Sequence, residues 1–390
     1  MMSVLAVVRS SRRVAAICLA ILAAVLGGAG SAMLGVCGPF TDVTDAAFCP
    51  FVLEIFTLGI TTGTTPTTYD PASAVTRLQM AAFLSRGVDA VLQRGSRRVL
   101  VKKFWTAQSP LAVGLTTLAD QPYAVACDGR DVWVAGNTGF VSRVRASDAR
   151  VLETWTNATG PSDSVIVAMG RIFVGGGNSG NLYRLDPSKP AASVKIVATL
   201  PVQVGALAFD GSRLWSANGS GSVSIWTPSE TIPWTATTVT TGFQGPLGIL
   251  YDGGNIWVTD SLASTLFKLD GGGAILQTVT LESRPYYPVF DGTNIWAPLV
   301  DLNAVAVVRA STGALLATLT GNGLNTPRAA SFDGQRVLVT SENGSNVSLW
   351  KAADMTALGS FPMPNPPDSV CSDGFNFWIG LTSASRLARF

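Results

Sequence analysis

Seven stretches of the chain share one pattern of polar and hydrophobic positions. Each begins with a tight turn, usually Asp-Gly, and continues into a short apolar run centred on an aromatic or branched residue. The turns start at Asp128, Met169, Asp210, Asp252, Asp291, Asp333 and Asp373, at intervals of 41, 41, 42, 39, 42 and 40 residues. A period near 40 residues with short strands is typical of a β-propeller, in which each repeat forms one blade. We therefore expect a mainly β protein in which residues 98–390 form seven blades.

The first repeat shows the four strands expected of a blade. From the innermost to the outermost they are expected at residues 123–127, 132–135, 140–144 and 151–155. Equivalent positions in stacked blades have equivalent surroundings, so we interpret the turn aspartates as turn residues and the recurring aromatics as core packing. These aromatics are Trp133, Phe173, Trp215, Trp257, Trp296 and Trp378.

The seventh repeat ends at Phe390 after its third strand, which would leave an open sheet edge. The apolar run 99–105 precedes the first repeat, and we predict that it completes the seventh blade. Cys127 and Cys371 stand one and two residues before their turn aspartates, so alternation places them on opposite faces of equivalent strands. Opposite faces meet where the first and last blades join. A Cys127–Cys371 disulfide is therefore predicted across this seam, with a loop-entropy contribution of about 4–5 kcal/mol.

A helical pattern replaces the strand pattern in residues 37–95, which we predict to form a separate small module. Apolar residues recur at helical spacing over residues 48–56, as Phe48, Phe51, Val52, Ile55 and Phe56. A second helix is expected after Thr76, because Gln79 completes a capping box. Met80, Phe83 and Leu84 would continue its buried face.

The start of the chain predicts export. Three arginines within residues 9–13 precede an apolar run over residues 14–26, and small residues up to Ala32 suit cleavage of a signal peptide spanning residues 1–32. The alternative is an uncleaved anchor, because no charged residue follows until Asp42. In either case the remainder is expected to be exported, as a secreted or cell-envelope-associated protein.

Cysteine usage agrees with export. Four cysteines follow the signal, namely Cys37, Cys49, Cys127 and Cys371. An even number in an exported chain favours disulfides over metal ligands, and no Cys-x-x-Cys spacing supports zinc. We predict a second disulfide, Cys37–Cys49, at the start of the small module.

Composition excludes several functional classes. The chain of 390 residues has 27 basic and 25 acidic side chains, so it lacks the basic excess expected of a nucleic-acid partner. It contains no histidine, which removes the Ser-His-Asp triad and histidine-ligated zinc. We interpret its low charge, 13% of residues, as sheets packed face to face, with no membrane contact beyond the signal or anchor. No catalytic residue, metal or cofactor is predicted.

The small module resembles one S-layer homology (SLH) motif. The matching residues are Phe40-Thr41-Asp42-Val43, then Leu58-Gly59-Ile60 and Gly63, then Tyr69, Pro71 and Val75-Thr76-Arg77. In that family three such motifs commonly bind secondary cell-wall polymer through the Thr-Arg segment. The resemblance therefore implies that Thr76 and Arg77 contact an envelope polymer. The alternative is a helix cap followed by an exposed cation.

The repeats resemble NHL/YVTN-type propellers of exported bacterial proteins, which include the streptogramin lyases. The stretches that carry this resemblance are residues 246–249, 252–258 and 307–316. Streptogramin lyases rely on a catalytic histidine, which this chain does not have. Sugar-lactonase propellers hold a metal with Glu, Asn and Asp, and no glutamate lies on an expected innermost strand here.

Residues that break the repeat are the ligand-binding candidates, because the loops entering the innermost strands commonly line one mouth of the channel. These loops carry Tyr123, Asp163, Tyr286, Tyr287, Arg328 and Asp368. The ends of the second strands carry Asn137, Asn178, Asn218, Asp260, Asp301 and Asn343. From these residues we predict a binding site at the channel mouth that contains Tyr123, Asp163, Asp260, Tyr286, Tyr287 and Arg328.

We therefore predict a non-enzymatic, exported cell-surface protein whose propeller is a binding or scaffold platform. Its partner would be an envelope polymer or a surface protein. Two alternatives stay open: a metal-dependent lactonase- or lyase-type enzyme that uses Asp and Asn in the channel mouth, and a purely structural envelope protein.

Overall fold

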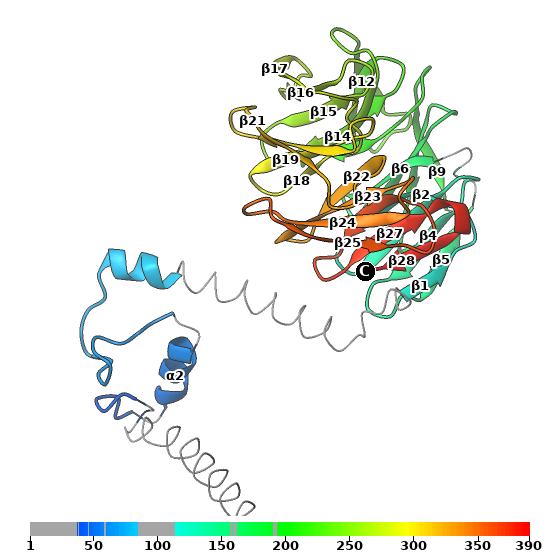
Figure 1. The fold of residues 1–390 in the computed structure, drawn as a ribbon. Helices are drawn as coiled ribbons and strands as arrows, with labels where there is room; N and C mark the ends of the chain where they lie inside the picture. Colours follow the sequence, from blue (N-terminus) through cyan, green and yellow to red (C-terminus); the bar gives the residue numbers. More distant parts are fainter. Residues whose placement is uncertain are drawn as a thin grey trace, which may run out of the picture. The chain divides into compact units, whose positions relative to one another are not determined.

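The computed structural model describes residues 37–84, apart from 38, 46, 58 and 59, and residues 114–390, apart from 157, 159–161 and 190–192. The chain divides into two compact units, Met1–Thr106 and Ala107–Phe390 (Figure 1). The expected signal peptide and the run 99–105 lie outside the described residues. Within these described ranges, no helix is long and apolar enough to cross a membrane.

The second unit is a propeller of seven four-stranded antiparallel sheets, which confirms the predicted fold. In the first six blades the strands follow chain order from the innermost to the outermost. The first blade contains β2 (Pro122–Cys127), β3 (Asp131–Gly136), β4 (Val141–Arg145) and β5 (Val151–Trp155), close to the predicted bounds. The second contains β6 (Ser162–Ala168), β7 (Arg171–Gly176), β8 (Asn181–Leu185) and β9 (Lys195–Thr199), and the third β10 (Leu207–Phe209), β11 (Leu214–Asn218), β12 (Ser222–Thr227) and β13 (Thr235–Val239).

The fourth, fifth and sixth blades repeat this order around the ring, and the seventh differs in its outermost strand (Figure 1). The fourth contains β14 (Pro246–Tyr251), β15 (Ile256–Asp260), β16 (Thr265–Leu269) and β17 (Ile275–Thr280), and the fifth β18 (Val289–Phe290), β19 (Asn294–Leu299), β20 (Ala304–Arg309) and β21 (Leu315–Thr320). The sixth contains β22 (Pro327–Phe332), β23 (Arg336–Ser341), β24 (Asn346–Lys351) and β25 (Ala357–Pro362). The seventh contains β26 (Pro367–Ser372), β27 (Phe377–Leu381), the short 3-10 helix η1 (Thr382–Ala384) and β28 (Arg386–Arg389).

N-terminal chain closes the seventh blade, as predicted, but the predicted segment was wrong. The outermost strand is β1 (Gly114–Thr117), paired in register with β28, and not the run 99–105. Only four residues separate β1 from β2, so the closing strand is the one directly before the first blade. An outermost strand needs little apolar surface. In β1 the buried Thr116 donates a hydrogen bond to Ala149 O at 2.9 Å, and Leu115 is exposed.

The seam also carries the predicted disulfide. Cys127 on β2 and Cys371 on β26 are bonded, with their Cα atoms 5.7 Å apart. These two innermost strands lie side by side where the first and last blades meet. The ring is therefore closed twice, by β1 at its outer edge and by a covalent bond near its axis.

In five blades the turn aspartate accepts a hydrogen bond from the indole N–H of the tryptophan five residues later. In the third blade, Asp210 Oδ1 accepts from the backbone N–H groups of Ser212 and Arg213, and Oδ2 accepts from Trp215 Nε1 at 2.8 Å. Four further pairs have the same bond at 2.7–2.9 Å: Asp128–Trp133, Asp252–Trp257, Asp291–Trp296 and Asp373–Trp378. The rings are fully buried between neighbouring blades. Turn formation and core packing, expected as separate roles, are thus coupled.

Two blades lack this pair, and neither leaves an indole N–H at that strand position or a turn carboxylate without a partner. The second blade has a two-residue turn at Met169 and Gly170, with φ values of 52° and 66°, followed by Phe173, which has no N–H to satisfy. In the sixth blade Leu338 takes the tryptophan position, and Asp333 pairs with Arg336 at 2.7 Å. Burial raises the pKa of Asp333. The second blade thus lacks both donor and acceptor, whereas the sixth keeps the aspartate and pairs it with an arginine in place of the indole.

The first unit is a small module built on helix α2 (Cys49–Thr57) and a second helical segment at residues 77–84. Its core contains Cys37, Phe40, Val43 and Val52, and the predicted Cys37–Cys49 disulfide is present. Asp42 joins the start of the module to its later loop, because its carboxylate accepts hydrogen bonds from the N–H groups of residues 69 and 70 at 2.7–3.1 Å.

The predicted buried faces of both helices were partly wrong. Phe48 and Phe51 are each 63% exposed, and α2 packs through Val52, Leu53 and Phe56 instead. In the second helix Met80 and Leu84 are exposed. Helical spacing identified the elements, but a core of so few side chains buries only part of each apolar stripe.

Replacing a turn aspartate should destabilise the propeller. We expect Asp210→Ala to lower the free energy of unfolding by about 2–3 kcal/mol, because it leaves a buried indole N–H and two turn amides without an acceptor. Chemical denaturation would measure this change. The matched control is Asp354→Ala, since Asp354 is half exposed and pairs with Lys351 at the surface, where we expect a much smaller loss. Equal losses in the two variants would contradict the proposed coupling.

Breaking the seam disulfide should also lower stability. We expect the Cys127→Ala, Cys371→Ala double variant to lose about 4–5 kcal/mol in the propeller's unfolding transition, because the cross-link closes a very long loop. Calorimetry would report the shift in Tm. The double variant at Cys37 and Cys49 should leave that transition unchanged, because this pair lies in the other unit. Free thiols at positions 127 and 371 in the oxidised protein would refute the cross-link.

Candidate functional site

A bulge begins most of the innermost strands and sets the direction of one side chain in each. The register shifts after Pro122, Ser162, Pro246, Pro327 and Pro367. A bulge leaves a residue unpaired and re-aims its side chain, and proline is tolerated there because no ladder N–H is required. The residues that directly follow these positions are Tyr123, Asp163, Leu247, Arg328 and Asp368, and Tyr286 follows Pro285 in the fifth blade. Most of the predicted binding residues therefore occupy one repeated position.

Threonine hydroxyls fix these bulges to the neighbouring blade. Thr259 Oγ1 accepts from Gly248 N at 2.9 Å and donates to Tyr286 O at 2.8 Å. Thr340 Oγ1 makes the same bridge two blades later, accepting from Ala329 N at 3.0 Å and donating to Asp368 O at 2.8 Å. Each hydroxyl thus joins the bulge of its own blade to the backbone of the next.

The fifth and sixth blades are further joined at the site itself. Tyr287 N donates to Arg328 O at 3.0 Å, and Ala330 N donates to Tyr287 O at 3.2 Å, in a short parallel bridge. This bridge brings Tyr286 and Tyr287, which precede β18, together with Arg328 on β22. Their relative positions are set by backbone hydrogen bonds rather than by side-chain contacts alone.

Arg328 is the centre of the side-chain cluster. Its Nε lies 2.8 Å from Glu342 Oε2 and 3.7 Å from Asp368 Oδ1, and its guanidinium carbon lies 4.9 Å from the centroid of the Tyr286 ring. The rings of Tyr286 and Tyr287 meet edge to face, with centroids 6.1 Å apart. We call Tyr286, Tyr287, Arg328, Glu342 and Asp368 the channel-mouth cluster.

Burial and charge shift the pKa values of this cluster. Burial raises the pKa of Asp368 to about 6, with a further increase from Glu342, and Arg328 only partly offsets this. For Arg328, burial would lower the pKa, but Asp368 and Glu342 outweigh it and raise the pKa. The arginine therefore stays charged, whereas Asp368 can gain or lose a proton near pH 6.

The other predicted residues have different surroundings. Asp260 is fully buried, and its carboxylate accepts from the N–H groups of Gln244, Gly245 and Ala263 at 2.7–2.9 Å, which holds a turn. Asp163 lies on β6, and its side chain is outside the described part of the chain. Tyr123 lies in the first blade and is 38% exposed. We place none of these three in the channel-mouth cluster.

Residues at the ends of the second strands mostly serve the fold. Asp301 forms a two-bond ion pair with Arg284, at 2.7 Å for each bond. Asn218 is fully buried among the hydroxyls of Ser216, Ser222 and Ser224. Glu342 is the one member of the cluster that sequence reasoning missed. It directly follows β23, the same kind of position as Asp301, and that position could have identified it.

In the small module, Thr76 and Arg77 begin the second helix. Thr76 Oγ1 accepts from Gln79 N at 3.2 Å, and Gln79 Oε1 accepts from Thr76 N at 2.9 Å, which is the predicted capping box. Both Thr76 and Arg77 are exposed. Over the described parts of both units, no group of three or more His, Cys, Asp or Glu side chains is arranged to hold a metal ion.

The raised pKa of Asp368 predicts how stability depends on pH. Between its unfolded value near 4 and its folded value near 6, the folded protein keeps a proton that the unfolded chain releases, so the free energy of unfolding falls as pH rises. We expect Asp368→Asn to remove this loss, with a relative gain on the order of 2 kcal/mol at pH 7 compared with pH 4.

Denaturation at the two pH values would measure the gain. Asp301→Asn is the control of opposite sign, because the hydrogen bonds and charge of Arg284 lower the pKa of Asp301. An identical pH dependence in the wild type and Asp368→Asn would show that Asp368 does not titrate in this range.

Comparisons with known proteins agree with the two units. Residues 39–81 match the family model of the S-layer homology domain. No curated protein matches the sequence. A catalytically inactive virginiamycin B lyase from Staphylococcus aureus, solved with quinupristin, superposes with a TM-score of 0.62 at 13% identity, covering 71% of this chain and 98% of that chain.

Other solved propellers are similar to the same degree. A streptogramin B lyase structure has a TM-score of 0.60 at 15% identity and covers 71% of this chain and 96% of its own. The WD40 propeller domain of Doa1 has the same TM-score, identity and coverage. At these identities the similarity shows the fold alone. The chain therefore carries an S-layer homology domain, which is associated with cell surfaces, and a seven-bladed β-propeller structurally similar to streptogramin B lyase.

Proposed function

We propose that this protein is exported and non-enzymatic, and that its S-layer homology domain attaches it to a cell-envelope polymer while the propeller binds a surface partner. The observation that carries the proposal is the family match over residues 39–81, whose last part contains the exposed Thr76 and Arg77. Both disulfides are compatible with export, because such bonds persist in oxidising compartments. The predicted signal peptide, residues 1–32, would direct the chain to export.

The start of the second helix suits an acidic polymer. Arg77 is the first helical residue, where the backbone already presents the positive end of the helix dipole. A cation at this position is unfavourable for the helix by itself, so its placement favours a role in binding. The Thr76–Gln79 capping box fixes the geometry of this turn, so the guanidinium extends from a defined base. An anionic group would be attracted by both the dipole and Arg77.

The channel-mouth cluster supports binding by the propeller. Two tyrosine rings lie beside an arginine that is held between two carboxylates, and these side chains are partly exposed. This combination suits a ligand that has an apolar face for the rings and polar groups for the charges. Hydrogen bonds between blades fix the backbone of the site, so ligand binding would have to order few further protein groups.

Wall binding should depend on Arg77. We expect full-length Arg77→Ala protein to sediment with purified cell wall at least about fivefold less than the wild type, because one charge-assisted contact is lost. Arg77→Lys should keep part of the binding, and Thr76→Ser should keep most of it, because serine preserves the helix cap. The bound fraction in the pellet is the measurement.

Arg145→Ala is the matched control on the propeller, where Arg145 forms an exposed pair with Asp148. We expect it to sediment like the wild type. If Arg77→Ala sediments as well as the wild type, Arg77 does not bind the wall. If the wild type does not sediment at all, attachment through this domain is wrong.

A further inference from the structure

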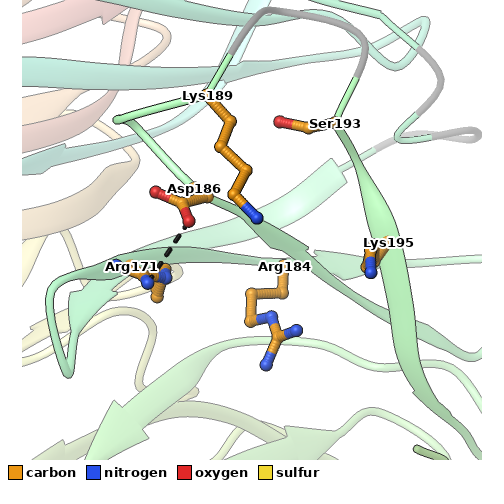
Figure 2. A pocket seen from close by; sticks show the side chains of 6 residues that line it. All are labelled: Arg171, Arg184, Asp186, Lys189, Ser193 and Lys195. Carbon is orange, nitrogen blue, oxygen red and sulfur yellow. Dashed lines mark ion pairs between the residues drawn. The ribbon is translucent and has the colours of Figure 1, made fainter.

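The second blade contains a pocket rich in positive charge, which lies outside the channel-mouth cluster. It has a volume of about 160 Å³ and is lined by Arg171, Arg184, Asp186, Lys189, Ser193 and Lys195. Figure 2 shows these six side chains around one space, with Lys189 reaching in from the turn after β8 and Lys195 standing on β9. Four cations face one carboxylate. We call this the blade-2 pocket.

The single carboxylate of the pocket, that of Asp186, already has hydrogen-bond and ion-pair partners. Asp186 accepts from Ser188 through both its backbone N–H, at 3.0 Å, and its hydroxyl, at 2.6 Å, and it pairs with Arg171 at 3.2 Å. These hydrogen bonds, together with Arg171 and Lys189, lower its pKa. Within the described residues, no carboxylate lies within ion-pair distance of Arg184, Lys189 or Lys195. The pocket therefore has three positive charges in excess.

Comparison with the first blade shows how this excess arises. There Arg143, opposite Trp133 in register, forms an ion pair with Asp131, with Nε 2.7 Å from Oδ2, and Glu153 lies opposite it on the next strand.

The second blade has an arginine at the same position, Arg184, opposite Phe173. The aspartate position is now Arg171, and the glutamate position is now Lys195. Both acidic neighbours of the central arginine are thus replaced by bases. Met169 also replaces the turn aspartate, which removes a third nearby carboxylate.

A buried hydroxyl points to a ligand in the same place. Ser193 Oγ is buried at the edge of the pocket and has no hydrogen-bond partner among the described residues. Buried polar atoms are nearly always paired, and an unpaired one costs about 1–3 kcal/mol. A bound oxyanion would accept from this hydroxyl and from the surrounding cations.

We propose that the blade-2 pocket binds a phosphate group. Guanidinium, ammonium and hydroxyl donors converge on it from three strands and a turn, and a phosphate group, which has more acceptor oxygens than a carboxylate and one or two negative charges, satisfies such a set better than a single carboxylate. The group is either free phosphate or a phosphodiester within a polymer. The site is independent of the S-layer homology domain and of the channel-mouth cluster.

Calorimetric titration of the full-length protein tests the proposal, with inorganic phosphate in one arm and glycerophosphoglycerol, a phosphodiester, in the other. We expect saturable binding in at least one arm, tighter than about 1 mM at low salt. Binding of the diester as tightly as phosphate identifies a polymer backbone as the source, whereas binding of phosphate alone identifies the free or terminal group. If neither binds below about 10 mM, the proposal is wrong.

Two variants test whether phosphate binds in this pocket. Ser193→Ala should weaken binding about tenfold without lowering Tm, because the hydroxyl has no partner among the described residues. Lys195→Gln should weaken it to a similar degree. Lys351→Gln, which removes one charge from a lysine paired with Asp354 in the sixth blade, should bind like the wild type. Unchanged affinity in Ser193→Ala and Lys195→Gln would overturn the assignment.

Discussion

The hydrogen bond from a buried indole N–H to a turn aspartate is the interaction on which the propeller depends. A tryptophan between two blades contributes a large apolar surface, but its N–H must find an acceptor away from water. The turn aspartate supplies one with Oδ2, while Oδ1 accepts from the turn's own amides. One carboxylate thus connects the local turn to the core between blades. The blades that lack the tryptophan do not leave a carboxylate without a partner.

Closure of the ring imposes a second constraint. Seven sheets of similar size must meet across a single seam, and β1 and the Cys127–Cys371 bond act at its outer and inner edges. Because closure keeps the blades equivalent, the first residues of the innermost strands, where five of the blades have a bulge, fall at the same end of the channel. A side chain at that position can change without disturbing the core. Tyr286, Arg328 and Asp368 occupy it in three successive blades, and this is how three distant parts of the sequence form one cluster.

Differences between repeats are the sites where chemistry can appear. The first blade surrounds Arg143 with acids, whereas the second surrounds Arg184 with bases on the same scaffold. The backbone pairing of the central arginine is the same in both blades, so the replacement changes the charge around it and leaves the strand register intact. The same reasoning separates Asp260, whose carboxylate is used by three backbone amides, from Asp368, whose carboxylate faces another side chain.

The sequence by itself determined the number of blades, the strand order, both disulfides and the capped second helix. Each of these follows from spacing or from contacts within one repeat. The tertiary structure decided the rest, because it depends on contacts between repeats. It selected Gly114–Thr117 as the closing strand, since chain length to the first blade matters more there than apolar content. It exposed Phe48 and Phe51, since a small core covers only part of each helix. It also brought Glu342 to Arg328 and, in the part of the chain that the structure describes, left Arg184 without a carboxylate, since ion pairing depends on which side chains lie within a few ångströms.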